Sequence, residues 1–147
     1  MVNFYPAFVD EGWRRYWKSR EKERDALREA VEAEYRERGE PVLYSVQMQV
    51  DRDFYAQHAD EMKLPGIEAV VEHIDYVARV AGIDHVGLGS DFDGFSLLPE
   101  GIASAADLPK ITAALMERGY TAEQMKKILG GNLLRVIQAV QAEAQTE

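Results

Sequence analysis

The sequence contains no cysteine, and this absence excludes several structures at once. Disulfide bonds, a thiolate nucleophile and a cysteine-rich zinc site all need a residue that the chain lacks. Histidine occurs three times, and never in a His-x-His or His-Glu-x-x-His pair. We therefore expect no metal site that this chain builds by itself.

Positive charge and long apolar runs are also scarce. The chain has 17 Lys and Arg residues against 26 Asp and Glu residues, which gives a formal net charge of -9. Because nothing supplies a broad basic field, nucleic acid and anionic membranes are not expected as partners. No apolar run is long enough to span a membrane, and residues 1–5 lack the basic start of a signal peptide. The compartment stays open, with the cytoplasm as the default.

Hydrophobic residues nevertheless make up 46% of the 147 positions, so a single domain with a packed core is expected. Residues 1–5 are predicted as a short buried strand that Pro6 ends, and a strand at the first residue suggests a truncated chain. Residues 10–38 combine helical spacing with dense mixed charge. This helix is interpreted either as a solvated helix that lies on a partner surface or as a lid over an active site.

The rest of the chain alternates between strand and helix patterns. Apolar residues at every second position predict a strand over 42–50, and residues 67–81 have one apolar helical face that ends at Gly82. Residues 85–90 are predicted as a buried parallel strand. This order of elements predicts an α/β fold with a parallel sheet. The remaining predicted helices are 109–118, one opened by a capping box of Thr121 and Gln124, and one after residue 132.

The strongest functional motif is residues 86–94, Val-Gly-Leu-Gly-Ser-Asp-Phe-Asp-Gly. Catalytic groups of parallel α/β folds lie at the carboxyl ends of strands, and Asp91 comes directly after the predicted strand. Asp93 lies two residues after Asp91 and so would be on the same side of an extended chain, and Gly94 permits a turn. Two carboxylates at a strand end suit metal binding, amine binding or proton transfer. Asp91 is therefore the candidate catalytic residue, whereas Asp93 fits a catalytic role and a capping role equally well.

The three histidines are weaker candidates than Asp91. His85 opens the strand that Asp91 closes, so at ~3.3 Å per residue it should lie ~20 Å away, at the wrong end of the sheet. His73 flanks an apolar helical face and is predicted to be a packing or hydrogen-bonding residue. His58 lies in a segment without a clear pattern.

Two other enzyme classes use a similar acidic motif. Phosphatases of the haloacid-dehalogenase type present their nucleophile in a strand followed by Asp-x-Asp-Gly, but early in the chain, with a lysine and an acidic cluster well downstream. Here Lys126 and Lys127 lie on a helix that no acidic strand end follows. A glycosyltransferase-type Asp-x-Asp would follow a nucleotide-binding pattern, and none precedes this one.

Residues 72–94, EHIDYVARVAGIDHVGLGSDFDG, closely resemble the C-terminal signature of the membrane dipeptidase (renal dipeptidase-like, M19) family. Residues 1–5 resemble the preceding barrel strand of that family, and residues 98–101 and 130–136 resemble later segments. The resemblance covers residues 1–8 and about 67–140. The charged stretch 10–65 resembles a variable helical insertion after the first strand.

The resemblance implies the C-terminal portion of an amidohydrolase-type (β/α)8 TIM barrel, made of strands seven and eight with their helices. It implies a metallopeptidase with two zinc ions that hydrolyses dipeptides, including those with a D-residue at the C-terminal side. The family residue that matches Asp91 holds the substrate amino group and passes a proton to the leaving amine. Asp93 is a second candidate for substrate binding. The zinc ligands of the family come from earlier strands, so none is expected in this chain.

Residues 1–147 are thus expected to form a partial peptidase domain that is inactive as an isolated chain. Its open edges and uncovered apolar faces predict association with the missing N-terminal half of the barrel or with further copies of itself. The alternative function is non-catalytic: a stand-alone fragment that acts as a protein-interaction module, with the helix at 10–38 as its binding surface.

Overall fold

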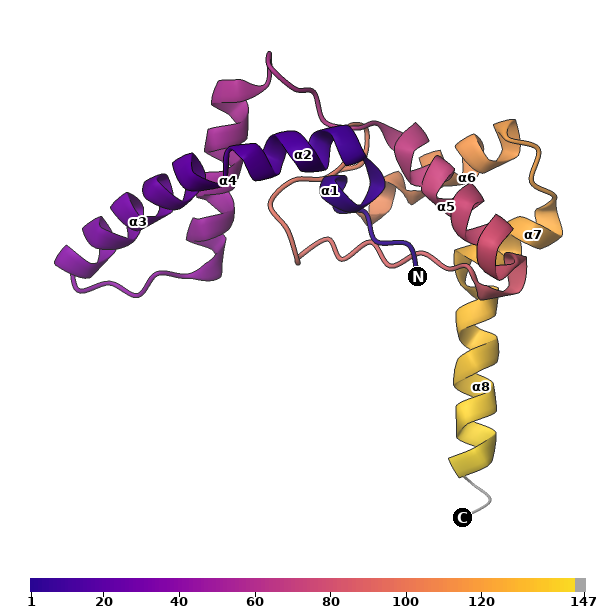
Figure 1. Cartoon of the computed structure of the whole chain (residues 1–147). Helices are drawn as coiled ribbons and strands as arrows, with labels where there is room; N and C mark the ends of the chain where they lie inside the picture. The colour runs from indigo at the N-terminus through magenta and orange to yellow at the C-terminus, as the bar shows by residue number, and fades with distance from the viewer. Residues whose placement is uncertain (145–147) are drawn as a thin grey trace.

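The computed structural model describes residues 1–144, and helices dominate this part of the chain. The helices are α1 (Pro6–Val9), α2 (Glu11–Ser19), α3 (Glu21–Glu37), α4 (Tyr44–His58), α5 (Ile67–Ala81), α6 (Leu108–Glu117), α7 (Ala122–Lys126) and α8 (Asn132–Ala144), and the short helical turns are η1 (Ile83–His85), η2 (Ala105–Asp107) and η3 (Lys127–Gly131). Figure 1 shows α3 and α4 as an arm on one side of the molecule and α5, α6 and α7 together on the other. In the same view α8 projects away from everything else.

The predicted α/β fold is wrong, because residues 1–144 contain no strand and no sheet. Residues 1–5 and 85–90, predicted as strands seven and eight of a (β/α)8 barrel, meet at one isolated parallel bridge between Val2 and Leu88. The N–H and C=O groups of a strand are satisfied by strands on either side of it. Within the described residues each of these two extended segments has only the other beside it, so pairing stops at the bridge. The chain is therefore not a portion of an α/β barrel.

Two further elements differ from the sequence-based expectation. The strand predicted over 42–50 is wrong, because these residues enter α4. The buried side chains of α4 are Val50 and Phe54, which are four residues apart, and this helical spacing prevails over the two-residue alternation before it. The single helix predicted over 10–38 is two helices, α2 and α3, separated at Arg20, whose φ of -97° and ψ of 9° are not helical.

The helices predicted for the C-terminal half are confirmed. α5 ends at Gly82, which takes a φ of 89° as its C-cap. α6 has Pro109 in its first turn, where the missing N–H costs no hydrogen bond. Thr121 and Gln124 form the expected capping box at the start of α7, with each side chain accepting a hydrogen bond from the backbone N–H of the other residue. Local capping chemistry therefore determines these helix boundaries.

Two clusters of buried side chains stabilise the fold. The first lies between α5, α6 and the extended segments, and Ile74 and Leu115 are fully buried in it. The second joins α2 and α4 to the loop at Leu97, and its centre is a stacked pair of rings, Trp13 and Trp17, with centroids 4.8 Å apart. Residues 1–5 connect the two clusters, since Val2 and Phe4 belong to the first while Tyr5 packs against the second.

α8 is attached to the body through its first turn. The buried Asn132 side chain donates hydrogen bonds of 2.8 Å to the carbonyl oxygens of Ile83 and Val86. Arg135 donates a hydrogen bond of 2.7 Å to the Asp84 carbonyl oxygen. Every residue from 133 to 144 is exposed, including the apolar side chains Leu133, Leu134, Val136, Ile137 and Val140. Neither α8 nor any other helix within residues 1–144 has the length and hydropathy needed to cross a bilayer.

The Asp107 carboxylate organises the loop before α6. It accepts hydrogen bonds from the backbone N–H groups of Ala103 (2.8 Å) and Ser104 (3.2 Å) and pairs with Lys110 Nζ at 2.6 Å. These contacts, the hydrogen bond from Lys110 first, lower the pKa of Asp107 from 3.8 to about 2.

We expect this loop to be acid-resistant. Because the pKa of Asp107 is lower in the folded state, its contribution to stability is complete above the unfolded value of 3.8 and is lost as the pH falls through about 2. A carbon-detected NMR titration of the Asp107 carboxyl group should have its midpoint near 2, and Lys110→Met should move that midpoint upward. A midpoint that the substitution leaves in place would contradict the assigned cause.

Candidate active site

The parallel bridge brings Asn3 beside Asp91. The backbone N–H of Val2 donates to the Gly87 carbonyl oxygen (2.6 Å), and the N–H of Gly89 donates to the Val2 carbonyl oxygen (2.8 Å). The two extended segments therefore run in the same direction and end at the same edge. At that edge the Asn3 side chain donates a 3.3 Å hydrogen bond from Nδ2 to Asp91 Oδ2.

Two contacts orient this pair. The backbone N–H of Tyr5 donates to Asn3 Oδ1 at 2.7 Å, which directs the NH2 group of the same amide toward the carboxylate. Asp91 itself takes a φ of 56°, the one positive φ outside glycine in residues 1–144. Its carbonyl oxygen accepts a 2.9 Å hydrogen bond from the N–H of Gly94, which closes a turn over residues 91–94. The carboxylate folds across this turn, where a Cβ atom on Gly94 would lie 2.2 Å from Asp91 Oδ1.

The turn is held from two sides. On the core side, the ring of Phe92 meets the buried ring of Phe4 edge to face, with centroids 6.0 Å apart. On the other side, the Tyr44 hydroxyl at the start of α4 donates a 2.7 Å hydrogen bond to the Gly94 carbonyl oxygen. Asp91 is exposed, so these contacts hold the backbone of the turn and leave the carboxylate open to a ligand.

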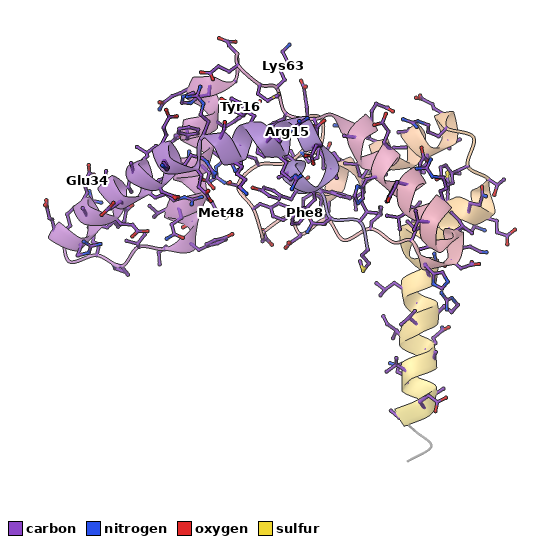
Figure 2. All side chains as sticks on the ribbon, in the orientation of Figure 1. Phe8, Arg15, Tyr16, Glu34, Met48 and Lys63 are labelled. Carbon is purple, nitrogen blue, oxygen red and sulfur yellow. The ribbon has the colours of Figure 1, made fainter. Side chains whose placement is uncertain are left out.

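A cavity of about 750 Å³ opens beside Asp91, between the 91–96 segment and the α3–α4 arm. Its volume lies within the range of roughly 300–1,000 Å³ that is common for small-molecule sites. Figure 2 shows two of its lining residues, Phe8 from α1 and Met48 from α4. The other lining side chains are carboxylates, aromatic rings and a few further groups, namely Asn3, Tyr5, Asp25, Arg28, Glu29, Glu32, Tyr44, Gln47, Asp51, Asp91, Phe95 and Ser96, with Gly94.

The α3–α4 arm is joined to the Asp91 segment through one charged network. Arg28 NH2 from α3 donates to both carboxylate oxygens of Asp51 from α4, at 2.7 and 2.8 Å. Asp51 Oδ2 also accepts a 3.0 Å hydrogen bond from the Ser96 hydroxyl. Together with the contact from Tyr44, this network fixes the arm relative to the turn. The arrangement can hold an ammonium group against Asp91 or exchange a proton with a ligand there.

The residues present do not fit a metal ion at Asp91. Within residues 1–144, no group of three or more His, Asp and Glu side chains could hold one. The Asp91 carboxylate faces the Asn3 amide. His58 is stacked on Phe54 in α4, and His85 is exposed in η1. His73 lines a different cavity, beside α1.

Asp93, the second predicted carboxylate, lines a different cavity from Asp91. That cavity has a volume of about 790 Å³ and includes Arg52 and Lys110. The structure therefore separates the two carboxylates that the motif places two residues apart. A role for Asp93 in substrate binding stays a prediction.

Sequence reasoning missed the partners of Asp91. Asn3 lies inside the segment 1–5 that was predicted as a strand, one residue after the bridge residue Val2, so the strand-end argument did not select it. Tyr44 and Ser96 carry no local pattern that could have identified them, because their contacts join residues 50 and 45 positions apart in the chain.

We expect Gly94→Ala to displace the Asp91 carboxylate while the fold is retained. The new Cβ would lie 2.2 Å from Oδ1 and 2.5 Å from Cγ of Asp91, so that side chain must rotate away from Asn3. Gly94 is not among the glycines with positive φ, so its backbone accepts alanine. In an NMR spectrum the Asn3 side-chain amide signals should shift and the dispersion of the core should persist. Gly66→Ala is the matched control, since nothing lies within 4 Å of a Cβ there; equal Asn3 shifts in both variants would contradict the expectation.

Comparison with protein families gives one match over the whole chain. The family model described as membrane dipeptidase (peptidase family M19) matches residues 1–147.

Individual relatives match part of the chain. Dipeptidase ataJ of Aspergillus terreus (strain NIH 2624 / FGSC A1156) is 43% identical over 89 residues, which are 60% of this chain and 22% of the relative. Dipeptidase tcpJ of Claviceps purpurea (strain 20.1) is 38% identical over 81 residues, 55% of this chain and 19% of the relative. The chain thus spans about a fifth of the length of the curated relatives it matches. Among solved structures, the probable dipeptidase PvdM from Pseudomonas aeruginosa is 32% identical, with a TM-score of 0.48 over 62% of this chain and 20% of that one.

Proposed function

The chain belongs to the membrane dipeptidase family (peptidase family M19), and from this premise we propose that it supplies part of the active site of an enzyme that hydrolyses dipeptides. The observation that carries the proposal is the Asp91 carboxylate. It is exposed, oriented by Asn3, and opens onto a cavity large enough for a dipeptide.

In the proposed mechanism Asp91 binds the amino group of the dipeptide and passes a proton to the amine that leaves. A carboxylate beside a cationic amine forms a charge-assisted hydrogen bond, which orients the dipeptide in the cavity. Hydrolysis adds water across the peptide bond, so the water oxygen bonds to the carbonyl carbon and the C–N bond breaks. The Asp91 carboxylate accepts a proton that the water releases and donates it to the nitrogen of the leaving amine. Asn3 keeps the carboxylate in place through its 3.3 Å hydrogen bond.

The metal chemistry belongs outside this chain. The family is metal-dependent, and the residues beside Asp91 do not fit a metal ion. We propose that the metals are two zinc ions, held by parts of a dipeptidase polypeptide that this chain does not include. Dipeptides with a D-residue at the C-terminal side are proposed as substrates alongside L-L dipeptides.

The isolated chain is proposed to be inactive until it associates with the rest of a dipeptidase polypeptide. It spans about a fifth of the relatives it matches, and it exposes apolar side chains such as Leu134 (59%) and Val140 (63%) on α8. Apolar groups gathered on one face of a surface helix favour burial against another protein surface. The large exposed apolar residues do not lie within 10–38, so α8 is the better candidate for this contact than the helix of the non-catalytic alternative.

A chimera tests the proposal. This chain would replace the matching segment of dipeptidase ataJ, and hydrolysis of L-Ala-L-Ala and L-Ala-D-Ala would be measured with zinc for the chimera and for the isolated chain. We expect turnover only in the chimera, with unmodified dipeptidase ataJ as the reference. Stoichiometric zinc together with turnover in the isolated chain would overturn the proposed dependence on other parts. A folded, zinc-loaded chimera that hydrolyses neither dipeptide would overturn the proposed function.

A further inference from the structure

We infer that the cavity beside Asp91 selects dipeptides with a cationic side chain, lysine or arginine, and that carboxylates on α3 make the selection. The inference rests on the proposed function and adds a substrate class to it. Its basis is the lining of one continuous cavity that Asp91 shares with the α3–α4 arm.

The cavity wall carries mostly negative charge. Five carboxylates line it, and Arg28 is the one cationic side chain among the lining residues. Arg28 is already engaged, because it holds Asp51 through two short hydrogen bonds and contacts Asp25 at 3.4 Å. That leaves Glu29, Glu32 and Asp91 without a cationic partner within the described residues.

Glu29 and Glu32 differ in what holds them. Glu32 Oε1 accepts a 2.9 Å hydrogen bond from Gln47 of α4, which orients the carboxylate and leaves its charge uncompensated. Glu29 has no hydrogen-bond or ion-pair partner in the described part of the chain and is exposed. Uncompensated charges of one sign in a concave wall add their potentials, so the cavity attracts cations and repels anions.

Aromatic rings form another part of the cavity wall. Tyr5 stacks on Phe95 with centroids 4.9 Å apart, and Phe8 packs edge to face on Tyr5 at 5.2 Å. The face of an aromatic ring attracts ammonium and guanidinium groups, and its apolar surface accepts the methylene stem of lysine or arginine. A cavity wall that combines carboxylates with aromatic rings suits a long cationic side chain better than a neutral or acidic one.

The part of the cavity wall that carries Glu29 and Glu32 is fixed relative to the 91–96 segment. Tyr44 connects α4 to the turn through Gly94, and Asp51 connects the arm to Ser96. Asp91 and the carboxylates of α3 therefore line one cavity whose walls are joined by these contacts. This arrangement distinguishes the wall from the carboxylates elsewhere on α3, which face solvent.

Binding to the intact chain tests the inference without catalysis. The probes are Lys-Ala and Ala-Lys, with Glu-Ala and Ala-Glu as acidic counterparts and Ala-Ala as the neutral reference, titrated at low salt and followed by NMR. We expect at least one lysine dipeptide to bind about tenfold more tightly than its acidic counterpart, and the difference to shrink at high salt. Equal affinities for lysine, neutral and acidic dipeptides would overturn the inference.

Matched variants locate the selection. Glu29→Gln combined with Glu32→Gln should remove most of the preference for lysine, whereas Glu34→Gln, on the same helix but outside the cavity lining, should preserve it. A preference that survives the double substitution would show that α3 does not select the side chain.

The same titrations separate this inference from the proposed function. Asp91→Asn should weaken binding of all five dipeptides by a similar factor. Unchanged binding in that variant would remove Asp91 as the amine site and leave the charge preference to be judged by the double substitution alone.

Discussion

Asp91→Asn is expected to lower kcat/KM for dipeptide hydrolysis by about 10²- to 10⁴-fold, the usual contribution of a positioned acid or base. The substitution is nearly isosteric, so the turn and the Asn3 contact persist while the negative charge and the proton acceptor are lost. The measurement is steady-state hydrolysis of L-Ala-L-Ala by the chimera with dipeptidase ataJ. Both kcat and KM should change, because the same group binds the amine and transfers the proton.

Asp93→Asn is the matched control for this experiment. It removes one carboxylate two residues away, but that carboxylate lines the other cavity. We expect its effect to be much smaller than that of Asp91→Asn. If the two variants lost activity equally, the assignment of the amine site to Asp91 over Asp93 would be wrong, and full activity in Asp91→Asn would remove the carboxylate from the mechanism.

Trp13→Ala should have the largest effect on stability, a decrease of about 3–5 kcal/mol in the free energy of unfolding, as is typical for removal of a buried aromatic ring. Trp13 is fully buried. Its ring stacks on Trp17 at 4.8 Å and meets Tyr5 edge to face at 6.2 Å. Its loss opens a cavity in the cluster that joins α2 and α4 to the loop at Leu97, so α4 loses packing against the body.

Urea denaturation followed by far-UV circular dichroism measures this change, and Trp17 remains as a fluorescent reporter of the second cluster. Arg15→Ala is the control on the same helix. Its side chain is exposed and pairs with Glu11 at 3.8 Å, so we expect a change within about 0.5 kcal/mol. A Trp13→Ala chain as stable as the Arg15→Ala chain would mean that the second cluster does not stabilise the arm.

The sequence predicts what is determined locally. The boundaries of α5 to α8 follow from caps and apolar spacing inside each segment, as at Gly82 and at the capping box of Thr121 and Gln124. Asp91 was found for the same reason, because the motif over 86–94 is continuous. No comparison tests its catalytic role, which stays a proposal.

Features that depend on distant residues were not predicted correctly. An extended segment becomes a strand only if other extended segments pair with it. The residues around Val2 and Leu88 have the sequence pattern of strands, but they form one bridge. The identity of α4 depends on the burial of Val50 and Phe54, and Phe54 packs against α2 and the loop at Leu97. The Arg28–Asp51 contact, between residues 23 positions apart, joins the two helices of the arm, and no local pattern predicts it.

The exposure of α8 bears on when this helix forms. Its 13 residues fall in the range, roughly 12–15, in which an isolated helix is only marginally populated in water. Asn132 and Arg135 nucleate its first turn against the body, while the residues that follow are solvated. Propagation of the helix beyond that turn is therefore coupled to burial of its apolar face, so that α8 and the surface that receives it would order in a single cooperative step.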